Sequence, residues 1–258
     1  MQFSPGQSHA LLQEVDSTGV LDWRRQVVRV TATGVASEQL TERRRPMAAI
    51  AAARQIIKEI LLQTLSGLPV ISNVTVGDLS KRSDEVSVRL AAITERFIVT
   101  EVKPTATGRV ELTAELPFAV IMAALLQSTY SQWESGKNVV HNRGTTTGIS
   151  GLIIDTRGTA FKPALLPKAR DEDGRELYGL KQAEPRWAIE TGLVGYAESL
   201  ESAIADPRIG HEPLLLRTVG AAGSEAVISR ADARRLENGV TQSKILPECR
   251  VVFIIGEK

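Results

Sequence analysis

The sequence predicts an α+β protein composed of two mixed α/β modules. A strongly amphipathic stretch over residues 46–65 is flanked by short strand-like runs, similar runs recur in the last third of the chain, and a segment rich in glycine and threonine, 134–148, separates the two halves. The first module is expected to be a small antiparallel sheet with helices packed on one face. We place the two domains at residues 20–133 and 149–258.

The chain has the composition of an ordinary globular protein, with 258 residues, of which 43% are hydrophobic and 24% are charged. This length is enough for two domains. The 31 basic residues are nearly balanced by 30 acidic ones, so no net field draws the whole protein onto nucleic acid or an anionic membrane. The aromatic content of 4% also argues against a stacking surface for single-stranded nucleic acid. No apolar run is long enough to predict a transmembrane segment.

The N-terminal residues, 1–18, are polar and are expected to form a loose lead-in. They lack the basic and apolar regions of a signal peptide, so the chain is either cytosolic or a mature form with an added Met1. The single Cys249 precludes an intramolecular disulfide and a cysteine-rich metal site. Because Cys249 stands next to an apolar strand, it is expected to be a small core residue.

The amphipathic stretch from Pro46 to Leu65 is expected to be the helix that anchors the first core. At about 100° per residue its apolar side chains fall on one arc, and its charged and amide side chains lie opposite. Pro46 suits the first turn, where its missing N–H costs no hydrogen bond, and Gly67 ends the helix. The apolar arc comprises Ala49, Ile50, Ala53, Ile56, Ile57, Ile60 and Leu61.

Shorter patterns predict the other elements of the first module. Alternating side chains predict a strand over residues 27–33, and residues 70–79 are expected to form an extended connection. Ser83 is expected to cap a helix over residues 84–96, because its side chain can accept a hydrogen bond from the first turn.

Two further strands, 98–103 and 109–116, are expected to form a hairpin, because Gly108 between them can adopt a positive φ. A sheet of these strands is too small to close into a barrel, so at least one edge should expose backbone N–H and C=O groups. Either another chain pairs with this edge, or the lead-in or residues 117–133 cover it. The 117–133 segment is itself either a packed helix or an irregular connection.

The second module is also predicted to be mixed α and β. The segment from Asp171 to Gly174 is expected to be a tight turn between two strands, and Ser199 and Ser229 are expected to precede short helices. The apolar run over residues 250–256 is expected to be a strand in the interior of its sheet. The other predicted strands are 149–155, 164–170, 175–178, 187–189, 194–196, 214–221 and 226–228, and the predicted helices are 200–205 and 230–237, the latter ended by Asn238 and Gly239.

The sequence offers no catalytic constellation, and no catalytic, cofactor-binding or metal-binding residues are predicted. The acidic run at Asp171 resembles the start of a calcium loop, but Ala169 and Leu180 would occupy positions that need an oxygen ligand, so a turn is favoured. The three histidines are too scattered for a zinc site. The candidate residues for a cleft in the second module are Asp155, Arg157 and Asp171.

Three runs in the first module resemble the LPP20 lipoprotein family, whose relatives include flagellar-associated outer-membrane lipoprotein P and the N-terminal domain of flagellar assembly protein T. They are LDWRRQVVRVTATGVA, RRRPMAAIAAARQIIKEILLQTLSGL and TVGDLSKRSDEVSVRLAAITERFIVTEVKPTATGRVELTAEL. The matching features are Trp23 before the first strand, the alanine-rich helix, and the second helix that leads into the Gly108 hairpin. The resemblance covers about residues 20–118. The later runs GLIIDTRG, ARDEDGRELYG and CRVVFIIG are similar to the C-terminal part of uncharacterised bacterial proteins.

The resemblance implies a bacterial envelope protein, exported and located in the periplasm or at the outer membrane. Because the two modules show no catalytic constellation, we expect a non-enzymatic structural or assembly protein near flagellar or other surface machinery. Its partners would be other envelope proteins or a second copy of the chain, which would give a homo-oligomer. The family's lipidated N-terminal cysteine has no counterpart here, which leaves lipid anchoring open. The alternative is a ligand-binding or hydrolytic protein with its site in residues 149–258.

Overall fold

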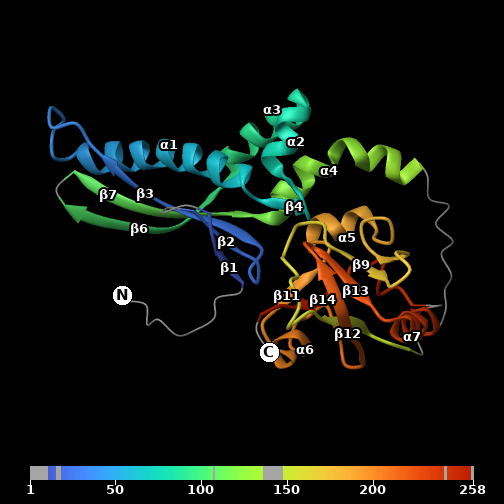
Figure 1. The fold of residues 1–258 in the computed structure, drawn as a ribbon. Helices are drawn as coiled ribbons and strands as arrows, with labels where there is room; N and C mark the ends of the chain where they lie inside the picture. The colour runs from blue at the N-terminus through green and yellow to red at the C-terminus, as the bar shows by residue number, and fades with distance from the viewer. Residues whose placement is uncertain (1–10, 16–18, 107, 136–147, 241–242, 257–258) are drawn as a thin grey trace. The chain divides into compact units, whose positions relative to one another are not determined.

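The computed structural model describes residues 11–15, 19–106, 108–135, 148–240 and 243–256, with the backbone alone at residues 127–135. The chain is α+β, as the sequence predicts (Figure 1). It divides into two compact units. The N-terminal unit comprises Gln13–Leu68 and Thr75–Leu125, and the C-terminal unit comprises Pro69–Val74 and Leu126–Lys258 together with the first residues of the chain.

The predicted domain limits, 20–133 and 149–258, do not anticipate the grouping of Pro69–Val74 with the C-terminal unit. The predicted linker, 134–148, lies largely outside the described residues. We therefore describe the two units separately and by their own contacts.

The N-terminal unit is built on a five-stranded sheet. Its strands are β1 (Leu12–Glu14), β2 (Gly19–Asp22), β3 (Val27–Val35), β6 (Ile98–Ala106) and β7 (Arg109–Pro117). The strand order is β1-β2-β3-β7-β6, and β3 and β7 pair antiparallel along their whole length. Gly108 has a φ of 73° between β6 and β7, so the predicted hairpin is confirmed.

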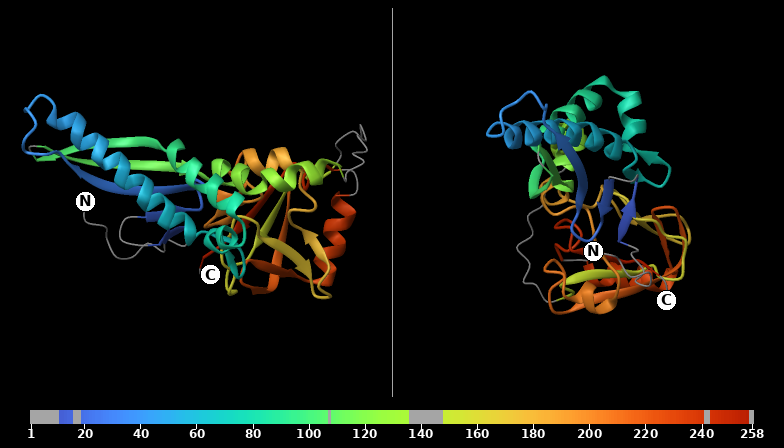
Figure 2. Two further views of the ribbon diagram at one scale, coloured as in Figure 1. Left: turned by 90° about the horizontal axis from the view of Figure 1, so that it is seen from above. Right: turned by 90° about the vertical axis from the view of Figure 1, so that its left-hand side faces the viewer.

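One long helix, α1 (Arg45–Ser66), lies along one face of this sheet (Figure 2). Gly34 on β3 allows a close approach, because a Cβ at Gly34 would lie 2.0 Å from the Ala49 carbonyl oxygen and 2.4 Å from the Ala53 nitrogen. The predicted apolar arc is wrong at Ile56, which is 37% exposed. Because α1 contacts the sheet through the small side chains of Ala49 and Ala53, only a narrow stripe of the helix is buried. The buried residues of α1 are Ala49, Ala53, Ile57, Leu61, Thr64 and Leu65.

Two short helices, α2 (Val76–Arg82) and α3 (Asp84–Ile93), and a 3-10 turn, η1 (Thr94–Arg96), lead into β6. Ser83 caps α3 as predicted, since its hydroxyl accepts a hydrogen bond from the Val86 N–H at 3.4 Å. The extended connection predicted over residues 70–79 is wrong after Thr75. The side chains of Thr75 and Asp78 form a reciprocal capping box, so α2 starts at Val76, directly after Thr75.

The segment that follows β7 is a helix, α4 (Phe118–Ser135), which is one of the two predicted alternatives. Phe118 contacts Trp23 edge to face, with ring centroids 5.2 Å apart, and both side chains are buried. This aromatic pair joins the start of α4 to the turn between β2 and β3, so the helix begins as part of the first core.

The C-terminal unit is built on a seven-stranded mixed sheet. Its strands are β8 (Gly151–Asp155), β9 (Lys168–Asp171), β10 (Glu176–Tyr178), β11 (Gly195–Ala197), β12 (Pro213–Ala222), β13 (Glu225–Ile228) and β14 (Val251–Ile254). Their order is β10-β9-β13-β12-β8-β14-β11. The half formed by β12, β8, β14 and β11 is parallel. The apolar β14 pairs on both sides, so its predicted interior position is confirmed.

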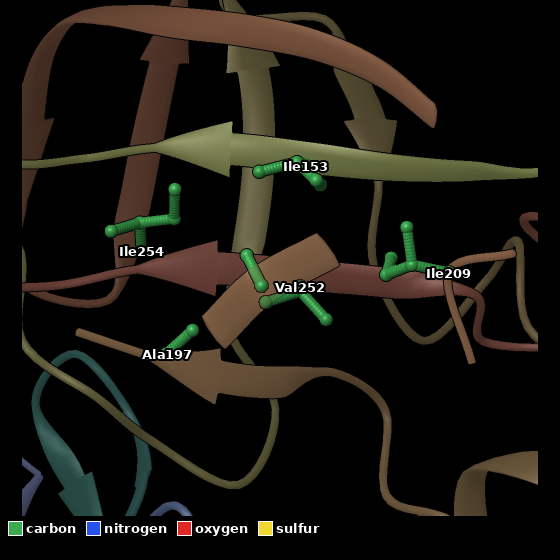
Figure 3. Packing of buried hydrophobic residues seen from close by; sticks show 6 residues of the cluster. Ile153, Ala197, Ile209, Val252 and Ile254 are labelled. Atoms are coloured by element: carbon green, nitrogen blue, oxygen red, sulfur yellow. The ribbon is translucent and has the colours of Figure 1, made fainter. Parts of the chain in front are cut away.

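An apolar cluster buries one face of the parallel half of this sheet (Figure 3). Its members are Ile153, Ala197, Ala203, Ile209, Val252 and Ile254. Ala203 comes from α6 (Leu200–Ile204), the short helix predicted after Ser199, and the Ser199 side chain caps it. Cys249, just before β14, is buried and confirms the expectation of a small core residue.

Three predictions in the C-terminal unit are wrong in part or whole. The strand predicted over residues 164–170 begins only at Lys168, in β9. Residues 187–189 belong to a helix, α5 (Pro185–Glu190), because Pro185 fixes a first-turn conformation and Arg186 donates to Glu190 at 3.1 Å, one turn later. The last helix, α7 (Arg230–Val240), runs through its predicted stop. At Gly239 a Cβ would lie 2.0 Å from Cδ1 of Ile149, so this glycine makes room for Ile149 to pack against the helix.

A short hairpin from the first half of the sequence belongs to the C-terminal unit. It contains β4 (Pro69–Ile71) and leads to β5 (Val74–Thr75). The N–H groups of Leu165 and Leu166 donate to the carbonyl oxygens of Pro69 and Val70 at 2.9 and 2.8 Å. The Ser72 hydroxyl accepts from the Ser224 N–H at 2.9 Å and lies 3.2 Å from the Ala222 carbonyl oxygen. The hairpin is thus hydrogen-bonded to the loop after β8 and to the turn between β12 and β13.

Ile57→Asp should unfold the N-terminal unit, because it places a carboxylate among fully buried side chains of α1. We expect a loss of at least about 3 kcal/mol in the free energy of unfolding. Gln63→Asp is the matched control on the same helix, since Gln63 is exposed and should change this free energy by less than about 0.5 kcal/mol. Thermal melts followed by circular dichroism compare the two variants, and equal stability would contradict the orientation of α1.

Gly223→Ala should destabilise the C-terminal unit. Gly223 has a φ of 59°, and a Cβ there would lie 2.6 Å from the Ser72 Cβ, so alanine is both strained and obstructed. We expect a loss of about 1–3 kcal/mol in the free energy of unfolding, measured by urea titration. Gly220→Ala on β12 is the control, because nothing lies within 4 Å of its added Cβ. A Gly223→Ala variant as stable as this control would argue against the hairpin contact.

Candidate functional site

Asp155 stands at the carboxyl end of β8, where open parallel sheets commonly bind ligands. Its carboxylate is 5% exposed and is held by a forked contact from Arg157, with Nε 2.9 Å from Oδ1 and Nη2 2.8 Å from Oδ2. The Arg157 N–H also donates to Oδ1 at 3.2 Å, and Arg217 on β12 brings a second guanidinium to 3.8 Å from Oδ2. The structure therefore brings Asp155 and Arg157 together.

The electrostatics of this pair favour the ionised form of both groups. Hydrogen bonds from Arg157 lower the pKa of Asp155 below its ordinary value, against the opposing effect of burial, and the charge of Arg217 adds to the lowering. The same carboxylate raises the pKa of Arg157. A carboxyl group that acts as a general base near neutral pH needs the opposite shift. Asp155 is suited to fixing the arginines at the end of β8.

Asp171 stands at the carboxyl end of β9 and organises the turn into β10. Its Oδ1 accepts hydrogen bonds from the N–H groups of Asp173 and Arg175 at 3.0 and 2.9 Å, and its Oδ2 accepts from Arg175 Nε at 3.0 Å. Gly174 has a φ of 85°, so the predicted tight turn is confirmed. Burial alone would raise the pKa of Asp171, but these hydrogen bonds and the Arg175 charge outweigh it and lower the pKa.

The three candidate residues do not converge on one cleft. Asp155 is opposite Arg217 on β12, whereas Asp171 is opposite Ile228 on β13, which in turn is opposite Thr218 on β12. Two strands therefore stand between the two aspartates. At about 4.8 Å per strand, three spacings separate them by roughly 14 Å.

Asp171 instead lines an open hollow of about 460 Å³, here called the arginine hollow. Its lining residues are Asp171, Asp173, Arg175, Arg230, Ala233, Arg234 and Glu237. Arg230 forms a forked contact with Asp173, with distances of 2.9 and 2.6 Å, and Arg175 pairs with Glu237 on α7. Three arginines and three acidic residues balance in charge. The sequence analysis missed the α7 residues, although the spacing of Arg230, Arg234 and Glu237 on one helix face could have indicated them.

The N-terminal unit contains a second cluster of charges that sequence reasoning missed. Glu115 on β7 is 8% exposed and accepts from Arg25 at 2.5 and 2.9 Å and from Arg29 Nε at 3.0 Å. Asp22 accepts from the Arg25 N–H at 2.9 Å. Burial would raise the pKa of Glu115, but the two guanidinium groups outweigh this and lower it. The pairing of Arg29 with Glu115 across β3 and β7 brings these residues together.

The N-terminal unit exposes a long strand, β6, which is one of the two outer strands of the five-stranded sheet. Among the described strands it pairs with β7 alone. Eight of its nine residues are exposed, including Ile98 at 59% and Val102 at 50%. The described part of the lead-in does not cover this edge, because β1 lies at the opposite edge of the sheet. Among the described residues, β6 therefore provides the exposed sheet edge that the sequence predicts.

Within the described ranges, His, Cys, Asp and Glu side chains nowhere gather in a group of three that could ligate a metal ion. His9 and His141 lie outside those ranges, and His211 is exposed. Across the same part of the chain, none of the helices combines the length and the apolar character needed to cross a membrane.

The comparisons concern the C-terminal unit. A family model described as Treponema pallidum Tp0624, second domain, matches residues 151–257, which run from the start of β8 past the end of β14. No curated protein matches the chain. Residues 151–257 are therefore similar to the second domain of Tp0624, and this range contains all seven strands of the C-terminal sheet.

Asp155→Asn should destabilise the C-terminal unit at pH 7, because it leaves Arg157 partly buried without its carboxylate partner. We expect a loss of about 1–3 kcal/mol in the free energy of unfolding, given that Arg157 retains some solvent contact. The folded-state pKa of Asp155 is lowered, so its contribution is full above the unfolded pKa of about 4 and is lost as the pH falls further. The difference between wild type and variant should therefore shrink toward pH 3 in urea titrations.

Glu190→Gln is the control for this measurement. Its pair with Arg186 is exposed on both sides, so the variant should change the free energy of unfolding by less than about 0.5 kcal/mol at either pH. If Asp155→Asn were as mild as this control at pH 7, the Asp155 pair would not stabilise the end of β8.

Proposed function

We propose that this chain is a non-enzymatic structural or assembly protein of the bacterial cell envelope, acting in the periplasm or at the outer membrane, in the setting of flagellar or other surface machinery. The observation that carries the proposal is the exposed outer strand β6. The resemblance of residues 20–118 to the LPP20 lipoprotein family supports the envelope setting.

An exposed strand edge is a recognition element in itself. A strand added to β6 would satisfy backbone N–H and C=O groups on its free side, while side chains on alternate positions would supply specificity. Ile98 and Val102 give the edge apolar side chains that a partner can bury. Assembly through such an edge requires no catalytic residues.

The charged clusters are consistent with this function. The carboxylates of Asp155, Asp171 and Glu115 each accept hydrogen bonds from arginine, and the pKa of each is lowered. Groups held in this way stabilise local geometry, whereas acid–base catalysis near neutral pH calls for a raised carboxyl pKa. The proposal therefore assigns these clusters to stabilising the two units.

The arginine hollow favours a second candidate function, ligand binding in the C-terminal unit. Arg234 is exposed at its rim, while Arg175 and Arg230 are positioned by acidic neighbours, so a ligand that carries an anionic group would meet oriented guanidinium donors. Arg234→Ala should weaken the binding of such a ligand in calorimetry, and Arg235→Ala, one residue along α7 and outside the hollow, is its control.

The assembly function is tested in bacterial cells that express the full chain with a photo-crosslinking amino acid at Val102. Val88 on α3 is the matched control position, because it is an exposed valine away from β6. We expect adducts from position 102 in the envelope fraction and none from position 88. A chain found in the cytosol, or one that forms no adduct from position 102, would contradict the proposal.

A further inference from the structure

We propose that the partner of β6 is β6 of a second copy of this chain, paired antiparallel about a two-fold axis at Val102. The inference rests on the proposed function and names the partner of the same edge. It joins two five-stranded sheets into one sheet that runs through both copies, with the same surface used on each side, as a two-fold axis requires.

The side chains of β6 divide between two faces according to their partners across the sheet. Val102 is opposite Leu112 on β7, which is opposite Ala32 on β3, on the face that α1 covers. Glu101 and Lys103 flank Val102 and therefore project from the other face. The centre of β6 thus carries one apolar side chain on the helix face and two opposite charges on the open face.

These charges select the register of the pairing. A two-fold axis at Glu101 would place two glutamates opposite each other, and an axis at Lys103 would do the same with two lysines. An axis at Val102 places Glu101 of each copy opposite Lys103 of the other, which gives two facing pairs of opposite charge. The two Val102 side chains then face each other. Opposite charges in directly facing positions stabilise an antiparallel pair and like charges destabilise it. Charge complementarity therefore favours the register centred on Val102.

The helix face of β6 supplies apolar surface next to this centre. Val102 is half exposed, although its neighbour Leu112 is fully buried. On α1, Arg54 lies 4.7 Å above the ring of Phe97, just before β6, so this flank of the helix points toward β6. Met47, two turns earlier on the same flank, is 70% exposed. A second copy would bury part of this surface together with the edge.

Irregularities in β6 restrict strand pairing at its free edge, so a dimer is favoured over an open-ended chain of copies. The ladder with β7 is irregular between Val99 and Glu101 and again between Pro104 and Ala106, and Pro104 has no N–H to donate. Such features oppose open-ended strand addition. They leave the stretch from Glu101 to Lys103 as the regular centre. A symmetric pair uses this centre once in each copy, so the expected product is a dimer.

Charge reversal at this centre tests the register with the purified full chain. Lys103→Glu should face glutamate with glutamate, and Glu101→Lys should face lysine with lysine, so each variant alone should raise the dimer dissociation constant by about tenfold to a hundredfold. Lys181→Glu is the matched control, since Lys181 is exposed in the C-terminal unit and should leave the constant unchanged. Sedimentation velocity over a concentration series measures all three.

Mixing the two single variants separates pairing from folding. One variant then presents two lysines and the other two glutamates, so every facing pair between them is of opposite charge, and a heterodimer should form with about the wild-type constant. A folding defect in either variant could not produce this recovery. A wild-type chain that stays monomeric at about 0.5 mM, reversal variants equal to the control, or a mixture that fails to associate would each overturn the inference.

A cysteine at the axis provides an independent measurement. Val102→Cys faces its own copy in this register, at a separation that a disulfide can bridge, and should form a covalent dimer under mild oxidation. Val88→Cys is the exposed control and should not, while the native Cys249 is buried and does not compete. If Val102→Cys stays monomeric while position 102 captures a different envelope protein in cells, the self-pairing is wrong and the assembly function stands. If no adduct forms in cells either, both fail.

Discussion

The close approach of α1 to β3 at Gly34 determines how the N-terminal unit is covered. With no side chain at Gly34, the backbone of α1 at Ala49 and Ala53 comes within van der Waals contact of the sheet. The helix is therefore centred over β3 and β7, whose helix-facing residues are buried, and it does not extend over β6. A larger residue at position 34 would lift the helix and expose the core beneath it. The same constraint that seals the core leaves the outer strand open to solvent.

Arginine is the recurring means by which this chain accommodates buried carboxylates. Asp155, Asp171 and Glu115 lie in different parts of the fold. Each carboxylate accepts at least two hydrogen bonds from arginine residues, through the guanidinium or the backbone N–H of the arginine. A carboxylate that is desolvated without such partners would be protonated or would destabilise the fold. The forked geometry of arginine satisfies both oxygens at once, which lysine cannot do. The clusters thus secure strand ends and the pairing of β3 with β7.

The sequence predicted the local features of the fold, such as helix caps, turns and hairpins, which depend on residues close together in the chain. The Ser83 cap, the short helix after Ser199, the Asp171 turn and the Gly108 hairpin are set within a few positions of the chain, and all four are present. Contacts between distant residues were not predictable in the same way. Ser72 meets the turn between β12 and β13 across 150 positions. Ile56 lies outside the buried stripe because of Gly34, which belongs to another element. The separation of Asp155 from Asp171 follows from strand order, which local patterns do not encode.

The outer strand combines features that attract a partner with features that restrict which partner it accepts. Exposed backbone alone would pair with almost any extended chain, which is the physical basis of aggregation. Pro104 and the two irregularities in the β6–β7 ladder shorten the usable edge, so backbone hydrogen bonds contribute less to association. The side chains in the centre of β6 must then determine which partner binds. Glu101, Val102 and Lys103 form a self-complementary sequence when read antiparallel, because reversing acid–apolar–base places acid opposite base. Selectivity from such a short element comes from the charges more than from buried area, which suits an association that depends on local concentration and ionic strength.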